Sequence, residues 1–172
     1  MPTQAWIVYR PRMKSLLLAM LVGLMMVGCG GPDLDDKKTR DKIIAEAIEE
    51  TSLQKRGKEG EQLAYAPNKQ SPYTGWVKEV NGNGQVSRLQ HYKYGKMDGL
   101  FIALDEKGKK RMEGNYKDGK QDGIFTSWYE NGQKKLELGW EDGKPVGVSA
   151  WYSKDGTGPS RFMPVDAERV RD

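Results

Sequence analysis

The side chains that carry most enzyme chemistry are scarce in this chain of 172 residues. It holds one histidine, His91, and one cysteine, Cys29, which are too few for a metal centre of the Cys/His type. His91 could act as a general base, but no nucleophile recurs near it, so we interpret it as an ordinary strand residue. Hydroxyl groups such as those of Thr126 and Ser127 have no attendant base, which leaves Ser/His/Asp catalysis without a candidate.

Carboxylates are plentiful, and a pair of them could in principle hydrolyse a glycosidic bond. However, Asp98 and Asp122 are 24 residues apart, and so are Asp118 and Asp142. Residues that recur with a structural period are explained more simply by turn chemistry. The sequence therefore predicts a protein that is not an enzyme, with no catalytic residues, no metal site and no cofactor.

Recurring aromatic residues and lysines are the candidates for a binding surface. Aromatic side chains spaced along a sheet could dock a peptide, a glycan or a partner's sheet, but they could equally form the core of the sheet. A lysine column could meet anionic lipid head groups, although neighbouring aspartates weaken its positive charge. Free edge strands offer a third route, by pairing with a strand of a partner. The candidate binding residues are Tyr116, Trp128, Trp140, Trp151, Lys96, Lys120 and Lys144.

The net charge does not point to nucleic acid. The formal charge is +4, but Arg10, Arg12 and Lys14 lie in an N-terminal stretch that has no acidic residue. Basic and acidic residues nearly balance in the rest of the chain. Nucleic-acid binding needs a clustered basic surface, so we expect no nucleic-acid partner.

The elements that must position these residues follow from a repeat of 24 residues. Dipeptides such as Asp118-Gly119, Asp142-Gly143, Lys107-Gly108 and Asn131-Gly132 have the composition of tight hairpin turns. Segments rich in aromatic and β-branched residues run between them, which predicts two strands and two turns in each repeat. Three columns of glycine keep the period: Gly75, Gly99, Gly123 and Gly147; Gly84, Gly108, Gly132 and Gly156; Gly95, Gly119 and Gly143.

The N-terminal region has the features of an export signal. Residues 15–27 form an uncharged apolar run that is short for a membrane span and typical of a signal-peptide core. The run ends at Gly28-Cys29, which resembles the lipobox of bacterial lipoproteins. The resemblance implies cleavage before Cys29, acylation of that cysteine and attachment to a membrane. Gly30 favours the outer membrane over the inner one, and Met13 could be the true start of translation.

Between Cys29 and the repeats we expect a tether over residues 30–40 and a short amphipathic helix over residues 41–56. The apolar side of this helix (Ile44, Ala47, Ile48 and Leu53) could pack on the first repeat or bind a partner helix. Residues 157–172 are expected to be mostly irregular, with one helical turn over the last hairpin and Phe162 folded back onto Trp151.

Strings such as GNYKDGKQDG and GIFTSWYENGQKKLELGWEDGKPVG resemble the bacterial variant of the MORN repeat, over about residues 73–156. The resemblance implies a mainly β fold, in which tandem 24-residue hairpins form a single elongated antiparallel sheet after a signal helix and a short amphipathic helix. The expected parts are a signal peptide (1–28), a tether and helix (29–62), a MORN-type array (63–156) and a C-terminal tail (157–172).

These features together predict a lipid-anchored, non-catalytic scaffold at the bacterial envelope that binds a protein or another envelope component. The alternative is an antitoxin-like protein that neutralises a partner toxin by binding it directly, since similar bacterial proteins carry that label. A toxin gene beside this one, with toxicity relieved by co-expression, would favour the alternative.

Overall fold

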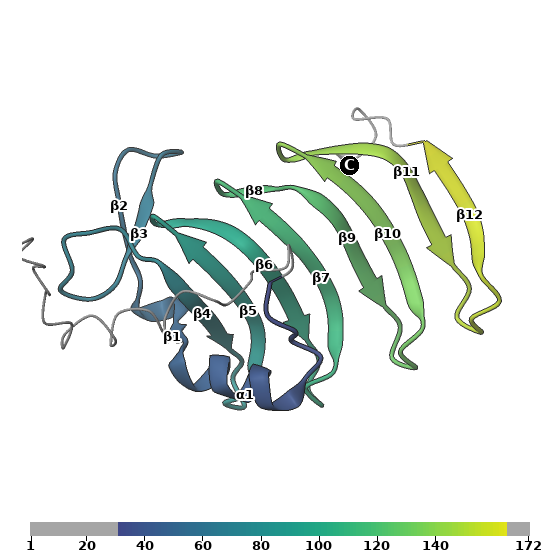
Figure 1. Cartoon of the computed structure of the whole chain (residues 1–172), viewed down its shortest axis with the longest axis horizontal. Helices are drawn as coiled ribbons and strands as arrows, with labels where there is room; N and C mark the ends of the chain where they lie inside the picture. The colour runs from purple at the N-terminus through teal and green to yellow at the C-terminus, as the bar shows by residue number, and fades with distance from the viewer. Residues whose placement is uncertain (1–30, 165–172) are drawn as a thin grey trace, which may run out of the picture. The chain divides into compact units, whose positions relative to one another are not determined.

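The computed structural model describes residues 31–164, which fold around one large sheet (Figure 1). The expected signal helix over residues 1–28 and the lipidation site at Cys29 lie outside this range. The strands of the sheet are β1 (Ile48–Glu49), β4 (Gly75–Val80), β5 (Val86–Lys93), β6 (Lys96–Leu104), β7 (Lys110–Lys117), β8 (Lys120–Gln121), β9 (Gly123–Trp128), β10 (Lys134–Glu141), β11 (Lys144–Tyr152) and β12 (Pro159–Pro164).

The strands follow one another across the sheet almost in chain order. The order is β1-β4-β5-β6-β7-β9-β10-β11-β12, and β8 pairs with β7. Every pair from β4 to β12 is antiparallel, whereas β1 runs parallel to β4. Two short strands, β2 (Gln54–Arg56) and β3 (Leu63–Tyr65), form a separate hairpin. The fold is therefore mainly β with a single large and mostly antiparallel sheet, as the sequence predicts.

The turns at one end of the strands are tight two-residue turns. Asp118 and Gly119 both have positive φ (51° and 88°), as do Asp142 and Gly143 (50° and 76°). Such turns match the right-handed twist of the flanking strands, and glycine enters them at little steric cost. The turn at Gly119 is also tied to the preceding hairpin, because the N–H of Gly119 donates to the carbonyl of Met97 on β6 over 2.8 Å.

The turns at the other end are longer than the sequence predicts. Within Lys107-Gly108 and Asn131-Gly132 only the glycines have positive φ. The loop at Gly108 spans residues 105–109, and the Asp105 Oδ1 atom accepts hydrogen bonds from the backbone N–H groups of Lys107 and Lys109, each over 2.9 Å. An aspartate side chain therefore closes this turn, which the Lys-Gly dipeptide alone does not reveal.

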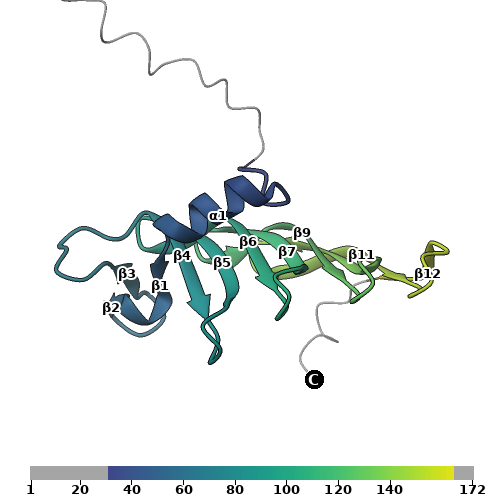
Figure 2. The same ribbon diagram turned by 90° about the horizontal axis from the view of Figure 1, so that it is seen from below.

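One helix, α1 (Lys37–Glu46), lies on one face of the sheet over its first strands (Figure 2). Leu34, Ile43 and Ala47 are buried against Leu89 and Ile102 in one apolar cluster. We call this side of the sheet the helix face. It continues through register partners of Ile102 on the later strands, namely Glu113, Thr126 and Glu137.

The helix begins and ends earlier than the range 41–56 expected from the sequence. Asp36 caps its first turn by accepting a hydrogen bond from the Thr39 N–H over 2.7 Å, and hydrogen bonds from the side chain and the backbone of Thr39 lower the pKa of the Asp36 carboxyl. The helix ends at Glu46 because Ile48 and Glu49 pair with β4. The Lys78 ammonium donates to the Ile44 carbonyl over 3.0 Å, where the helix leaves its last carbonyls without a partner.

The predicted tether over residues 30–40 is also wrong within the described range. Leu34 is only 3% exposed and belongs to the core, and α1 starts three residues later. Burial of an apolar side chain of this size typically stabilises a fold by about 1.5–3 kcal/mol, so the segment is held in place. The folded part therefore begins close behind Cys29.

The opposite face of the sheet is covered at the same end by the segment 48–65. Ala64, Val77 and Tyr92 form a second buried cluster, and Ile48 and Leu53 pack against it. This segment includes η1 (Glu50–Ser52) and β3. It covers apolar residues of the opposite face, just as α1 covers apolar residues of the helix face. Both covers lie over the first strands.

The expected irregular tail is wrong for residues 159–164, which form strand β12. This strand pairs with β11 and aligns Arg161 with Trp151 and Phe162 with Ala150. The described part of the tail contains no helical turn.

No helix within residues 31–164 is long and apolar enough to cross a membrane.

Candidate binding surface

The single histidine is already occupied by structural contacts. His91 Nδ1 lies 2.8 Å from the Asp98 carbonyl oxygen. Its ring also meets the ring of Trp76 edge to face, with 5.2 Å between the centroids. Among residues 31–164, no three His, Cys, Asp or Glu side chains form a group that could hold a metal ion.

Two of the predicted binding residues, Tyr116 and Trp140, lie in an aromatic ladder on the opposite face. The ring centroids of Tyr116 and Phe125 are 5.6 Å apart, and those of Phe125 and Trp140 are 6.2 Å apart. The ladder begins at Phe101, and Phe101 and Phe125 are buried. Burial raises the pKa of the Tyr116 hydroxyl. These rings pack on one another and serve as core, which is one of the two roles that the sequence leaves open.

Trp128 lies on the helix face instead. The Lys110 ammonium sits 5.0 Å from the centre of its ring. The same ammonium binds the carboxylates of Glu113 at 2.5 Å and Asp35 at 2.7 Å. Burial lowers the pKa of Lys110, but the hydrogen bonds to the two carboxylates outweigh it, so the pKa is raised and the amine keeps its charge. Trp128 is therefore packed under a structural ion cluster.

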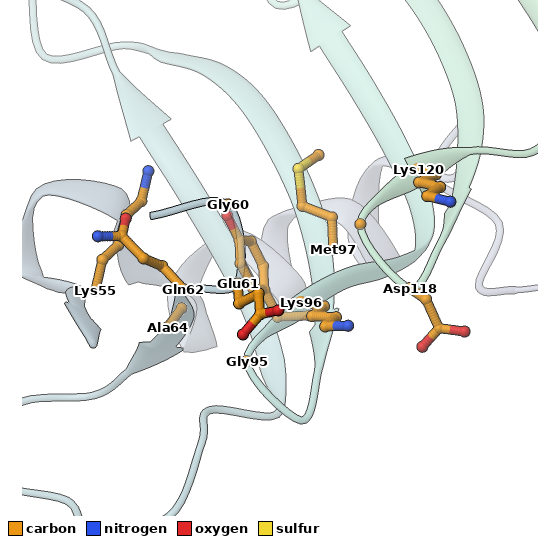
Figure 3. Close-up of a pocket in the computed structure, with 12 residues that line it drawn as sticks. Lys55, Gly60, Glu61, Gln62, Ala64, Gly95, Lys96, Met97, Asp118 and Lys120 are labelled. Carbon is orange, nitrogen blue, oxygen red and sulfur yellow. The ribbon is translucent and has the colours of Figure 1, made fainter. Parts of the chain in front are cut away.

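The predicted lysine column lies at the end of the sheet that carries the two-residue turns. Lys96 and Lys120 line a pocket of about 450 Å³, together with Lys55, Met97 and Asp118, and Lys144 does not reach it. Figure 3 shows Asp118 and Lys120 on one side of this pocket and Lys55 on the other, so its amines do not converge.

Moreover, the Lys120 ammonium binds the Asp142 carboxylate at 2.7 Å, which lowers the pKa of Asp142. Because one of these amines is paired with a carboxylate and the others do not converge with it, they do not make a strong anion site. The structure thus separates the lysine column from the aromatic candidates.

Trp151 belongs to a strip of side chains on the opposite face that no core cluster includes. Register pairs place Met112 beside Ser127, Ser127 beside Leu136, and Leu136 beside Trp151. Met112 and Trp151 are each 40% exposed, and both covering segments pack on the first strands. We call these four residues the open strip.

Of this strip, only Trp151 is among the binding residues that the sequence predicts. A signal for the others exists, because Met112 and Leu136 are 24 residues apart, and so are Ser127 and Trp151. The 24-residue period therefore places Met112 and Leu136 at one position of the repeat and Ser127 and Trp151 at another, and the two positions lie side by side on the sheet. Neither methionine nor leucine is distinctive enough in sequence to be separated from ordinary core residues.

The outer edge of the sheet is poorly suited to accept a partner's strand. β12 starts at Pro159 and ends at Pro164. Proline has no backbone N–H to donate to a neighbouring strand, and it is a common device for protecting sheet edges. The open strip is a better candidate for a docking surface than this edge.

Comparison with known proteins adds no relative: no family model matches the chain, and no curated protein resembles it significantly.

Proposed function

We propose that this protein is a lipid-anchored, non-catalytic scaffold of MORN-repeat type that works at the bacterial envelope and binds a protein partner through the open strip. The repeat assignment is supported by the tight turns at Asp118-Gly119 and Asp142-Gly143, which lie 24 residues apart and have the same backbone conformation. The anchor assignment is supported by the apolar run and by Cys29 at its end.

The single observation that carries the binding role is the exposure of Met112 and Trp151 in the open strip. Tryptophan is a frequent anchor of protein interfaces, where it contributes a large apolar surface. The direct neighbours of Trp151 across the strands are Leu136 on β10 and Arg161 on β12. Tryptophan and arginine are both enriched among the residues that dominate the binding energy of protein interfaces, so this composition favours a protein partner.

Site-specific photo-crosslinking in cells tests this role. A crosslinker placed at residue 151 should give a discrete protein adduct. The matched control is residue 124, because Ile124 is 64% exposed and lies two residues before Thr126 on the helix face. Adducts of equal yield from both positions, or none from residue 151, would contradict binding through the open strip.

Membrane fractionation and mass analysis of the wild type against Cys29→Ser test the anchor. The wild type should fractionate with membranes as a chain that begins at an acylated Cys29, and the variant should not. If both forms were uncleaved and absent from membranes, the lipoprotein assignment would be wrong. The antitoxin-like alternative would then be the better one, and its partner should be sought in the cytoplasm.

A further inference from the structure

The chain enters its folded part at Leu34, only five residues after Cys29. Leu34 is buried with Ile43 and Ile102 on the helix face. Its carbonyl accepts a hydrogen bond from the Arg40 guanidinium over 3.0 Å, and the next residue, Asp35, binds Lys110 on β7. The point of entry is thus fixed on one side of the sheet by apolar, hydrogen-bonded and ionic contacts.

The length of chain between Cys29 and Leu34 limits how far a membrane anchor can stand from the sheet. Five residues span at most about 18 Å when they are fully extended. An α-helix with its side chains is about 10–12 Å across, so α1 alone fills much of that distance. A lipid on Cys29 would therefore hold the helix face close to the bilayer surface.

The outer side of α1 is polar, which suits the head-group layer of a bilayer. Lys37, Lys38 and Lys42 are exposed there, as are Asp41, Ala45 and Glu46, while Ile43 and Ala47 face the sheet. Lys37 pairs with Asp41 at 3.2 Å. Three further aspartates (Asp33, Asp35 and Asp36) are exposed just before the helix, so the lysines lie among acidic residues and the region has no excess of positive charge.

We propose that the helix face is turned toward the membrane, with the outer side of α1 against phospholipid head groups, so that the open strip points away from the bilayer. This orientation rests on the proposed lipid anchor at Cys29. It gives the anchor a second role, because it decides which face of the sheet a partner can reach.

Energy transfer in proteoliposomes tests the orientation. Acylation blocks Cys29, so Ala45→Cys on α1 and Met112→Cys in the open strip each supply a single free thiol for a donor dye. The vesicles contain phosphatidylglycerol, phosphatidylethanolamine and a lipid with an acceptor dye on its head group. Transfer should be higher from residue 45 than from residue 112. A flexible Gly/Ser insertion of about 20 residues after Gly31 should remove the difference.

Equal transfer from the two positions, or more from residue 112, would overturn the orientation if mass analysis shows the lipid on Cys29. A chain without the lipid mass and without transfer from either position would instead refute the anchor itself.

Discussion

Glu137 on the helix face shows how single side chains stabilise the part of the sheet that α1 does not cover. Its carboxylate binds the Lys134 ammonium at 2.5 Å and accepts a hydrogen bond from the Tyr152 hydroxyl. The contact with Lys134, followed by that with Tyr152, lowers the pKa of Glu137 from its ordinary value of 4.5. The pKa of Tyr152 is raised by the same hydrogen bond.

The lowered pKa of Glu137 predicts a pH-dependent contribution to stability. At neutral pH the wild type should be more stable than Glu137→Gln by about 1 kcal/mol, because a charged hydrogen-bond acceptor is lost. In acid the unfolded state takes up the proton first, since its glutamate has the higher pKa. The advantage should therefore decline below pH 4.5 and vanish once the pH falls through the folded-state pKa.

Urea unfolding of both proteins between pH 7 and pH 3 measures this difference. The exposed residue Glu130 provides a matched control through Glu130→Gln, whose partner Arg111 also binds Asp105. A difference between wild type and Glu137→Gln that stays constant down to pH 3 would contradict the assigned role of the carboxylate.

Among the elements, the strands and tight turns were the most predictable from the sequence, and the covers were the least. Glycine at positive φ and aromatic residues at a fixed period are local signals, so Gly119 and Phe125 could be placed correctly. The helix was misplaced because its start depends on the cap at Asp36 and its end on the pairing of Ile48 with β4. That pairing joins residues distant in sequence and overrides local helix propensity.

The part of the helix face that α1 covers is limited by a change in the residues that recur along this face. In the part under the helix these are Val86, Leu89 and Leu104, which belong to its apolar cluster or pack against it. The residues 24 and 48 positions later are Lys110, Glu113 and Trp128, and then Lys134, Glu137 and Tyr152. A helix with an apolar side could not cover the charged sets without burying their charges. The sequence holds this information, but only the fold reveals which set is covered.

The aromatic ladder depends on a glycine in the strand that it crosses. A Cβ atom at Gly114 would lie 2.5 Å from atoms of the Phe125 ring, which is too close for any contact. Gly114→Ala should therefore displace the ring and destabilise the protein by about 1–3 kcal/mol. Chemical denaturation measures the change.

Gly82→Ala is the matched control for Gly114→Ala, because no atom lies within 4 Å of the added carbon. Its effect should stay within about 0.5 kcal/mol, as is usual for surface substitutions. Equal stabilities of Gly114→Ala and the wild type would show that the ladder is not packed as described.

At the scale of the whole folded part, the N-terminal segment belongs to the fold rather than to a flexible leader. Leu34→Ala should destabilise the protein by about 2–3 kcal/mol, because it removes a buried side chain from the cluster under α1. Lys38→Ala, at an exposed position four residues later, should change stability little. Thermal unfolding of the chain from Cys29 onward compares the two. Similar melting temperatures would contradict the burial of Leu34 and with it the short distance to the anchor.

The prolines of β12 have a consequence for solubility. A sheet whose strands recur in sequence is a template for pairing with another copy of itself, because each edge resembles the strand that would come next. Without a stop, such molecules could join edge to edge into fibres. Pro159 and Pro164 remove backbone donors at both ends of β12, the last strand of the described residues, while β1 occupies part of the edge of β4. The two edges of the array are therefore protected by different means, and growth into a polymer is opposed at both.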